Sequence, residues 1–275
     1  MMPKTVTLIR HGESESNRAQ KLAEEGLAHE NEAALMSVHT SERRLTPRGI
    51  EQAQATGAFI RAWMHRWSIS VGECRFYVSP YARTMETAGH MDIVNARWRL
   101  ENRIVERNWG SMDQLTYAER IRVYGELKLR KEHAFFWRPS DGETMQDVFN
   151  RYRDLVGTMH RDCPEMHVVI VAHGELMWAA RTLHEHWSPH ELRREMLRRD
   201  DHTRLVNCRV VQYSRRACDG LDPRWTPRIQ SVRFVDPVAP EDSERNLDWR
   251  PVTQQTFSSG ELLARAEQYP RFGDS

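Results

Sequence analysis

Short apolar runs alternate with amphipathic stretches along most of this chain. Thr5 to Arg10 (T-V-T-L-I-R) is rich in β-branched residues and too short for a helix, which predicts a buried strand. His167 to Ala172 (H-V-V-I-V-A) is apolar on both faces and predicts a central strand. Further strands are expected at residues 75–79, 103–106, 205–213 and 229–235.

Helical periodicity separates these runs. Thr46 and Pro47 are a typical N-cap and first-turn pair, and an apolar stripe at three- and four-residue steps follows them. The clearest stripe runs from Met145 to Met159. Further helices are expected at residues 82–90, 117–132 and 175–185, whereas residues 17–44 give mixed signals that assign no element.

The alternation of strands and helices predicts a three-layer α/β/α fold around a mostly parallel central sheet. No internal repeat and no Gly/Ser-rich linker divides the chain, so we expect one domain over residues 1–236 with a helical insert at about 111–140. Residues 237–275 are rich in charge and proline, which predicts an irregular C-terminal extension.

The charge balance narrows the possible partners. The 275 residues carry 40 Lys and Arg against 39 Asp and Glu, a net charge of +1. Proteins that coat nucleic acid or anionic membranes usually carry a strong positive excess, so neither partner is expected. The longest apolar run, Val168 to Ala172, is far shorter than the roughly 20 residues of a membrane span. Four cysteines without paired spacing, and an N-terminus without an apolar signal core, favour a cytoplasmic protein.

Charged and polar residues gather where the predicted strands end. In chain order, these residues are Arg10 and His11, Arg83, Glu106, and His173 with Gly174. Ligands of doubly wound sheets bind just beyond the carboxyl ends of the strands, so these side chains are expected to converge. A lone histidine or arginine at a strand end is usually structural or solvated, but four successive strand ends of this kind favour a functional site.

These residue types suit the binding and transfer of a phosphoryl group. Guanidinium groups offer forked donors that match phosphate oxygens. An imidazole between them can act as a nucleophile and split one transfer into two easier steps through a phosphohistidine. A carboxyl group near the leaving oxygen can protonate it and later activate water. The glycines that follow both histidines are expected to let the backbone approach the phosphate closely.

Five motifs carry a family resemblance. They are R-H-G-E-S-x-S-N (10–17), L-T-P-R-G-I-E-Q-A (45–53), S-P-Y-A-R-T-M-E-T-A (79–88), E-R-N-W-G (106–110) and A-H-G (172–174). In this order they resemble the histidine phosphatase superfamily, the phosphoglycerate mutase-like clan, over roughly residues 4–214. The resemblance implies a phosphoglycerate mutase-like fold for the domain of residues 1–236.

The resemblance also implies a role for each matched residue. His11 would be the nucleophile that is phosphorylated during turnover. Arg10, Arg83 and His173 would surround the phosphoryl group, with Asn17 and Gly174 as further phosphate-binding positions. Glu106 would protonate the leaving alcohol and then act as the base for water. No metal ion or other cofactor would be needed, because the cationic side chains would stabilise the transition state.

Three features of the sequence favour a phosphatase over a mutase. Glu175 follows A-H-G where mutases carry Asn, and Trp109 stands where mutases carry Tyr in E-R-H-Y-G. Residues 111–140 lack the Arg-Arg-Ser run of the mutases. We therefore expect a phosphomonoesterase that acts on a small phosphorylated substrate or on a phosphoprotein. The alternatives are a mutase-type phosphotransferase and a pseudo-enzyme that only binds phosphorylated ligands.

Two clusters of basic residues have simpler interpretations. His184, His186 and the nearby His190 resemble a metal-binding set, but residues two apart on a helix face different directions, so an exposed helix end is expected. The basic run 192–199 is interrupted by Glu195 and predicts a solvated face.

The remaining aromatic residues and the oligomeric state complete the expectations. Trp63 and Trp67 are expected in the core. The cluster 135–137 (F-F-W) is expected either in the core or at the substrate entrance, because pockets commonly have aromatic walls. The sequence leaves the oligomeric state open, with a homodimer as one option.

Overall fold

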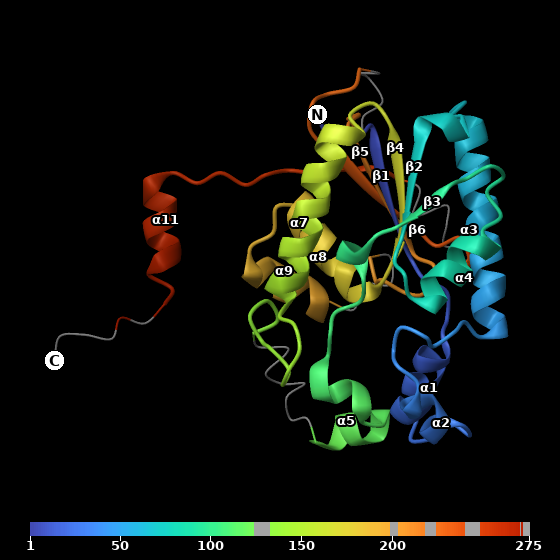
Figure 1. Ribbon diagram of the computed structural model, residues 1–275. Helices are drawn as coiled ribbons and strands as arrows, with labels where there is room; N and C mark the ends of the chain where they lie inside the picture. Colours follow the sequence, from blue (N-terminus) through green and yellow to red (C-terminus); the bar gives the residue numbers. More distant parts are fainter. Residues whose placement is uncertain (124–132, 199–202, 218–223, 240–247, 270, 272–275) are drawn as a thin grey trace.

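A central sheet organises the computed structural model in Figure 1, which describes the chain except for residues 124–132, 199–202, 218–223, 240–247, 270 and 272–275. The described strands form one seven-stranded sheet in the order β3-β2-β4-β1-β5-β6-β7. In chain order they are β1 (Thr5–Arg10), β2 (Cys74–Val78), β3 (Trp98–Leu100), β4 (His167–Ala172), β5 (Val210–Ser214), β6 (Ser231–Val235) and β7 (Arg250–Pro251).

The inner strands β1 and β4 are parallel and bring the two predicted histidines together. Their register joins Thr5 to His167 and Arg10 to Ala172. The parallel part of the sheet continues through β2 and β3, whereas β5, β6 and β7 form an antiparallel part. Because β1 and β4 end side by side, the residues that follow them, His11 and His173, lie at the same edge of the sheet.

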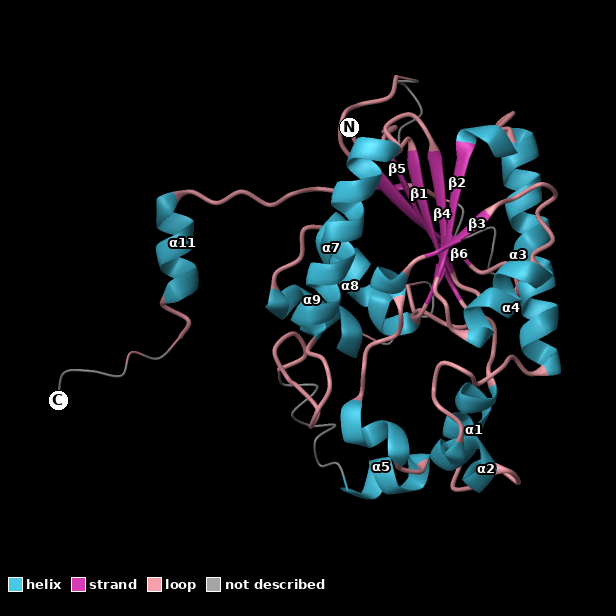
Figure 2. Cartoon of the chain, in the orientation of Figure 1, coloured by secondary structure: helices cyan, strands magenta, loops and turns pink. Residues whose placement is uncertain are grey.

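Helices cover both faces of the sheet, which confirms the three-layer fold (Figure 2). The helices α3 (Pro47–Arg66) and α4 (Ala82–His90) lie on one face, and α7 (Met145–Asp162), α8 (Gly174–His184) and α9 (Pro189–Leu197) lie on the other. Each face has its own core, because successive strand residues point to opposite sides. Ile9 belongs to the core beneath α3, and its neighbour Leu8 belongs to the core beneath α7.

Local sequence signals set the starts of the two longest helices. Thr46 caps α3 by accepting a hydrogen bond from the Gly49 backbone N–H, and Pro47 occupies the first turn. α7 begins with a capping box, in which the Thr144 hydroxyl accepts from the Asp147 N–H and the Asp147 carboxylate accepts from the Thr144 N–H. α3 therefore begins where the sequence predicts, and α7 begins at Met145, the first residue of the predicted apolar stripe.

A small helical layer lies beyond the carboxyl ends of the parallel strands, at the bottom of Figure 1. It contains α1 (Glu15–Glu24), α2 (Glu32–Ser37), the 3-10 helix η3 (Gly110–Gln114) and α5 (Tyr117–Val123). α1 contacts α5 and α2 contacts η3, so two distant segments form one cover over this edge of the sheet. Of the helix predicted at 117–132, α5 confirms the first part, and residues 124–132 lie outside the described residues.

The third strand lies earlier in the chain than the sequence predicts. The expected strand at 103–106 is wrong, since β3 is Trp98–Leu100 and the 3-10 helix η2 (Asn102–Ile104) follows it. Trp98 packs against Phe76 of β2 with ring centroids 5.1 Å apart. Arg103 forms ion pairs with both Glu101 and Asp154, which holds this part of the chain in a turn. Glu106 consequently follows a turn and not a strand.

The described part of residues 237–275, expected to be irregular, contains two elements of regular structure. β7 pairs with β6, and α11 (Ser259–Ala266) stands apart from the layers in Figure 1. The expectation of an irregular extension is therefore wrong for these two elements. A further 3-10 helix, η1 (Val71–Glu73), leads into β2. Among the described helices, none combines the length and the apolar character that crossing a lipid bilayer requires.

Two side chains occupy other environments than predicted. Trp67 is 51% exposed, whereas Trp63 is buried as expected. His184 is buried and shares a hydrogen bond of 2.8 Å with the Tyr152 hydroxyl, so the expectation of an exposed helix end is wrong for this residue. The cause is that α8 packs against α7 up to its last residue. His186 and His190 are exposed as expected. Arg193 and Arg194 are exposed, as the solvated-face prediction requires.

Candidate active site

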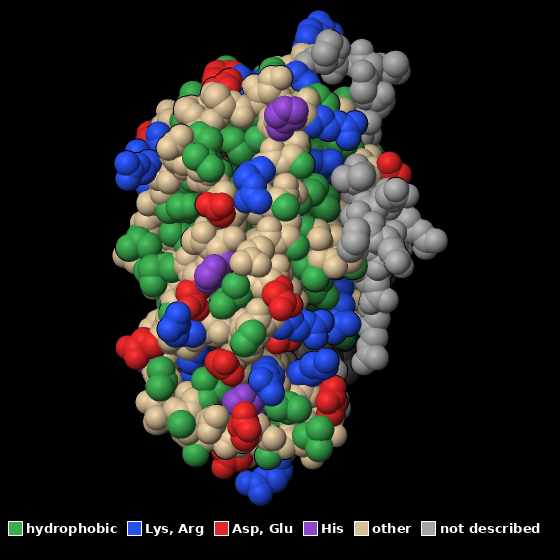
Figure 3. Space-filling model, turned by 90° about the vertical axis from the view of Figure 1, so that its right-hand side faces the viewer, with side chains coloured by type: hydrophobic (Ala, Val, Ile, Leu, Met, Phe, Trp, Pro, Cys, Tyr) green, Lys and Arg blue, Asp and Glu red, His purple; other side chains and the backbone are tan. Residues whose placement is uncertain are grey.

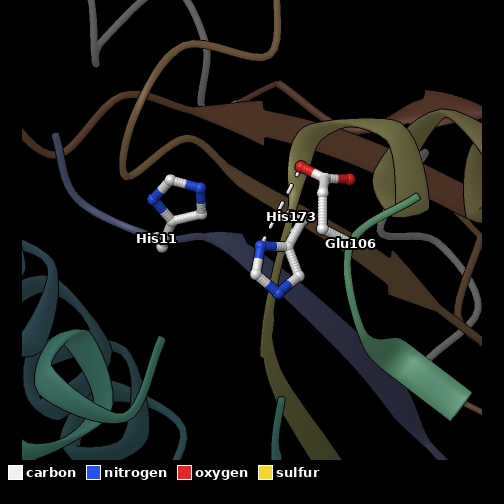
Figure 4. A group of neighbouring side chains, drawn as sticks. All are labelled: His11, Glu106 and His173. Carbon is white, nitrogen blue, oxygen red and sulfur yellow. Dashed lines mark ion pairs between the residues drawn. The ribbon is translucent and has the colours of Figure 1, made fainter. Parts of the chain in front are cut away.

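The residues predicted from the strand ends converge on one cavity. It has a volume of about 350 Å³ and lies at the carboxyl edge of the sheet. The predicted residues in its wall are Arg10, His11, Asn17, Arg83, Glu106 and Gly174. His173 lies next to them, with its ring centroid 5.3 Å from that of His11. Figure 4 shows His11, His173 and Glu106 pointing toward one another.

The hydrogen bonds of His11 define its tautomer. Its Nδ1 lies 2.7 Å from the Gly12 carbonyl oxygen, and a carbonyl can only accept, so Nδ1 carries the proton. The lone pair is therefore on Nε2, which accepts a hydrogen bond of 3.2 Å from Nε of Arg83. Burial, with the charges of Arg83 and Arg10, holds the pKa of His11 well below its usual value. His11 is thus a neutral imidazole whose lone pair, on Nε2, is held by the hydrogen bond from Arg83 in this structure.

Gly12 is required by the packing of α3, and the predicted approach of its backbone to phosphate stays a prediction. A Cβ at residue 12 would lie 2.4 Å from the Gly49 carbonyl oxygen, and a Cβ at residue 49 would lie 2.0 Å from the Glu13 carbonyl oxygen. Helix α3 can therefore touch the loop after β1 only because both residues lack side chains. Gly174 differs, because a Cβ there would meet no described atom closer than Nε of Arg10 at 3.5 Å, an ordinary contact.

Each of the two predicted arginines donates to a backbone carbonyl through Nη1. Nη1 of Arg10 donates to the Leu205 carbonyl at 2.6 Å, and Nη1 of Arg83 donates to the Thr40 carbonyl at 2.6 Å. Nε of Arg10 is buried and has no hydrogen-bond partner in the described part of the chain. Burial also lowers the pKa of Arg10, followed by opposing effects of Glu106 and Arg83. An anion in the cavity would satisfy this buried donor, whose desolvation is otherwise costly.

His173 holds a second buried nitrogen without a hydrogen-bond partner among the described residues, next to the residues that line the cavity. It occupies the N-cap position of α8, and its Nε2 is 2.8 Å from the Ser79 hydroxyl oxygen. Its Nδ1 has no hydrogen-bond partner among the described residues and lies 3.9 Å from Oε2 of Glu106. Burial, followed by the charge of Arg83, lowers the pKa of His173 well below its usual value. A phosphate dianion beside Nδ1 would favour the protonated ring.

Glu106 has the properties of a proton donor. Burial is the largest effect and raises the pKa of its carboxyl group, against the lowering effect of Arg83. Its Oε1 accepts a hydrogen bond of 2.9 Å from the Arg107 backbone N–H, which fixes the orientation of the carboxyl group. A carboxyl group with a raised pKa keeps its proton at higher pH than usual and can donate it.

Asn17 is held with its amide nitrogen available to a ligand. Its Oδ1 accepts from Nδ2 of Asn207 at 2.9 Å and from the Ser14 backbone N–H at 3.3 Å. Its Nδ2 makes no hydrogen bond to a described residue and remains a donor toward the cavity. Asn207, which the sequence did not single out, also donates to the His11 carbonyl at 3.1 Å. Only the spatial neighbourhood of Asn17 reveals this residue.

A buried arginine network fixes the loop that carries Glu106. Arg107 donates to the Glu143 carbonyl from Nε and to the Trp137 carbonyl from Nη2, both at 2.8 Å. Arg151 of α7 donates to the Glu106 carbonyl at 3.2 Å and pairs with the Glu143 carboxylate. Arg107 belongs to the motif E-R-N-W-G, in which the resemblance implies a role for Glu106 only. The motif could therefore have pointed to Arg107 as well.

The outer part of the cavity contains residues that the sequence did not place there. Arg43, Arg120 and Asp113 line it, together with Trp109 and Trp178. Arg120 comes from the insert and lies 3.5 Å from Asp113. The aromatic cluster 135–137 is not part of the lining, because Phe135 packs against the core beneath α7 and Phe136 is 59% exposed.

The cavity also contains a set of ligand atoms suited in type to a metal ion. One atom each from His11, Glu106 and His173 lie within 4.8 Å of one another. The guanidinium groups of Arg10 and Arg83 act on the same residues and oppose the binding of a cation. The charges at this site therefore favour an anion, and the expectation of a metal-free site remains a prediction that chelation tests.

Comparison with known proteins identifies the family. Residues 6–216 match the model of the histidine phosphatase superfamily (branch 1), and the chain belongs to this superfamily. The phosphoglycerate mutase-like protein AT74 of Arabidopsis thaliana is 32% identical over 191 residues, which cover 63% of this chain and 55% of the relative. The 6-phosphofructo-2-kinase/fructose-2,6-bisphosphatase of Gallus gallus is 26% identical, over 64% of this chain and 31% of the relative. The chain thus matches less than two thirds of the length of either relative.

Solved structures confirm the phosphoglycerate mutase-like fold. A mycobacterial glucosyl-3-phosphoglycerate phosphatase in complex with VO3 has a TM-score of 0.59 at 20% identity, over 77% of this chain and 92% of that chain. A phosphoserine phosphatase from Entamoeba histolytica has a TM-score of 0.53 at 19% identity, over 76% of this chain and 89% of that chain. Membership of the superfamily supports a phosphoryl-transfer enzyme, and the solved structures show the fold.

Proposed function

We propose that the protein is a phosphomonoesterase that hydrolyses its substrate through a phosphohistidine on His11. The observation that carries this proposal is the state of the His11 ring, whose Nδ1 donates to the Gly12 carbonyl so that Nε2 holds the lone pair. The guanidinium groups of buried Arg83 and half-buried Arg10 stand beside this nitrogen, and a carboxyl group with a raised pKa shares its cavity. Nucleophile, charge stabilisation and proton donor are thus present together.

In the first step, Nε2 of His11 attacks phosphorus. The new P–N bond forms while the P–O bond to the alcohol breaks, and Glu106 gives its proton to the leaving oxygen. Arg10, Arg83 and His173 stabilise the charge on the equatorial oxygens. The amide of Asn17 and the backbone N–H of Gly174, at the N-terminus of α8, add donors to these oxygens.

In the second step, water attacks the phosphohistidine. Glu106 is now a carboxylate and accepts a proton from the water as its oxygen bonds to phosphorus. The P–N bond breaks, the electron pair returns to Nε2 of His11, and inorganic phosphate leaves. Both side chains regain their starting protonation states, so the cycle consumes only the ester and water.

Glu175 favours hydrolysis over a mutase reaction. Its side chain lines the cavity, where it places a carboxyl group close to the phosphate position. Such a group opposes a second anionic group of the kind that a phosphoglycerate substrate carries. We expect the substrate to be a small phosphorylated molecule or a phosphoprotein segment whose leaving group reaches the outer cavity.

The proposal is tested with a generic aryl phosphate in the presence of EDTA. The wild-type protein should release phosphate, and an acid-labile phosphoenzyme should be trapped on rapid quenching. His11→Ala should abolish both signals, whereas His65→Ala on the exposed face of α3 should keep them.

Three other outcomes would contradict the proposal. Activity that disappears with EDTA would overturn the metal-free mechanism. Dependence on a bisphosphoglycerate primer would establish a mutase. Binding of a phosphopeptide without any phosphoenzyme would establish a pseudo-enzyme.

A further inference from the structure

A second carboxyl group stands in the wall of the cavity. Glu175 follows Gly174 at the start of α8, and its side chain is only 12% exposed. It lines the same cavity as Glu106. A buried carboxylate beside a phosphate pocket weakens the binding of a dianion. A role other than phosphate binding would therefore explain why a carboxylate lies there.

Glu175 contacts the residue that orients the proton donor. Its Oε2 lies 3.3 Å from Nη1 of Arg107. The backbone N–H of Arg107 donates to Oε1 of Glu106 at 2.9 Å. The guanidinium group of Arg107 donates to two backbone carbonyls. It also packs against the rings of Trp109 and Trp137, at 4.6 and 5.4 Å from their centroids. Glu175 and Glu106 are therefore linked through one immobilised residue.

Most charged groups around Glu106 favour loss of its proton. Arg83 of α4 and Arg10 of β1 act in this direction, and so does the Arg107 N–H. His173 at the start of α8 adds a positive charge whenever its ring is protonated, 3.9 Å away. Glu175 is the negative group that acts against them. Without it, burial alone would have to keep the carboxyl group protonated among cations.

We propose that Glu175 is a positioning residue for the proton donor: its carboxylate keeps Glu106 in the acid form, and its contact with Arg107 holds the backbone that orients Glu106. This inference rests on the proposed function, because it assigns a part in leaving-group protonation. The same negative charge opposes retention of the product phosphate. One residue thus supports leaving-group protonation and limits product inhibition.

Three variants separate the charge of Glu175 from its structural contact. Glu175→Gln removes the charge but keeps an amide oxygen that can accept from Arg107. Glu175→Asp keeps the charge. Glu143→Gln is the matched control, because Glu143 contacts Arg151 of α7 and the Asn108 N–H near Glu106 but is not among the largest charge effects on Glu106.

The measurement compares an alkyl phosphate with p-nitrophenyl phosphate over a range of pH. For Glu175→Gln, the basic limb of kcat for the alkyl ester should move to lower pH, because Glu106 loses its proton more readily. Alkyl turnover on that limb should fall roughly three- to tenfold, and aryl turnover less than about twofold, because an activated leaving group needs little protonation. Inorganic phosphate should inhibit this variant more strongly, while Glu175→Asp should restore the wild-type limb.

The outcomes distinguish this inference from the proposed function. An unchanged limb in Glu175→Gln, or equal losses for both esters, would overturn the role of Glu175 while the wild-type enzyme still turned over. A shifted limb in Glu143→Gln would show that the loop and not the charge is responsible, and would also overturn it. Failure of the proposed function looks different, because the wild-type protein would then form no phosphohistidine.

Discussion

Gly49 tests whether the packing of α3 positions the nucleophile. It lies in the first turn of α3, against the loop that begins with His11. A Cβ at this residue would lie 2.0 Å from the Glu13 carbonyl oxygen, whereas Cβ contacts shorter than 3.0 Å essentially do not occur. In Gly49→Ala the helix and the loop must therefore separate by about 1 Å, a distance set by the difference between these two values.

The expected losses follow from that displacement. Overpacking of this kind costs about 1–3 kcal/mol, and 1 kcal/mol corresponds to roughly 2–4 °C in Tm for a domain of this size. We expect Gly49→Ala to lower Tm by roughly 2–12 °C. A shift of about 1 Å near a reacting group can cost about a hundredfold in rate, so kcat should fall by one to two orders of magnitude.

Gly157 provides the matched control in α7. A Cβ there would meet no described atom within 4 Å, and the residue is exposed. Gly157→Ala should therefore raise stability by about 0.5–1 kcal/mol and leave kcat unchanged. Thermal unfolding and turnover of an aryl phosphate measure both quantities. Wild-type Tm and kcat in Gly49→Ala would refute the argument that the Gly12–Gly49 contact sets the position of His11.

Three other predictions concern protonation. Glu106→Gln should slow alkyl phosphates about 10²–10³-fold more than activated aryl phosphates, and equal losses would argue against the proton-donor role. In the wild-type protein, kcat for alkyl phosphates should fall as the pH rises through the raised pKa of Glu106. Because the pKa of His11 is lowered, His11 stays neutral and the enzyme should remain active well below pH 6.5. Loss of activity near pH 6.5 would contradict the neutral state of His11. Burial lowers the pKa of His184 to about 3, whereas an unfolded histidine has a pKa of about 6.5. Between these values the unfolded chain binds the extra proton, so stability should fall as the pH drops from about 6.5 toward 3. Urea unfolding at several pH values should show that His184→Gln flattens this dependence.

The elements of the fold that can be predicted are those whose own residue pattern indicates a strand or a helix. β4 is buried on both sides and reads as one apolar run, and α7 combines a capping box with a continuous stripe. β3 has only three residues, two of them exposed, and exists because it pairs with β2. Residues 103–106 carry a strand-like pattern, but the ion pairs of Arg103 impose a turn there. Long-range pairing of this kind cannot be recognised from local residue patterns.

The site divides in the same way. Strand order and the rule for strand ends bring His11 and His173 together, so both follow from the sequence. Asn207 and Arg120 reach the site from loops or inserts whose paths depend on tertiary packing. Gly12 shows another limit, because its motif indicates the need for a glycine but does not reveal the close contact with α3.

The balance of charges predicts how the protein captures its substrate. The net charge is +1, and on the face in Figure 3 the basic and acidic side chains are interspersed. Such a surface produces little long-range attraction for an anion. The cations expected to select phosphate, half-buried Arg10 and buried Arg83, line the cavity and act at short range, where salt screens them weakly. We therefore expect kcat/KM for a small phosphate ester to change less than about threefold between 20 and 200 mM salt. A steep decline over this range would show that surface charge and not the cavity governs capture.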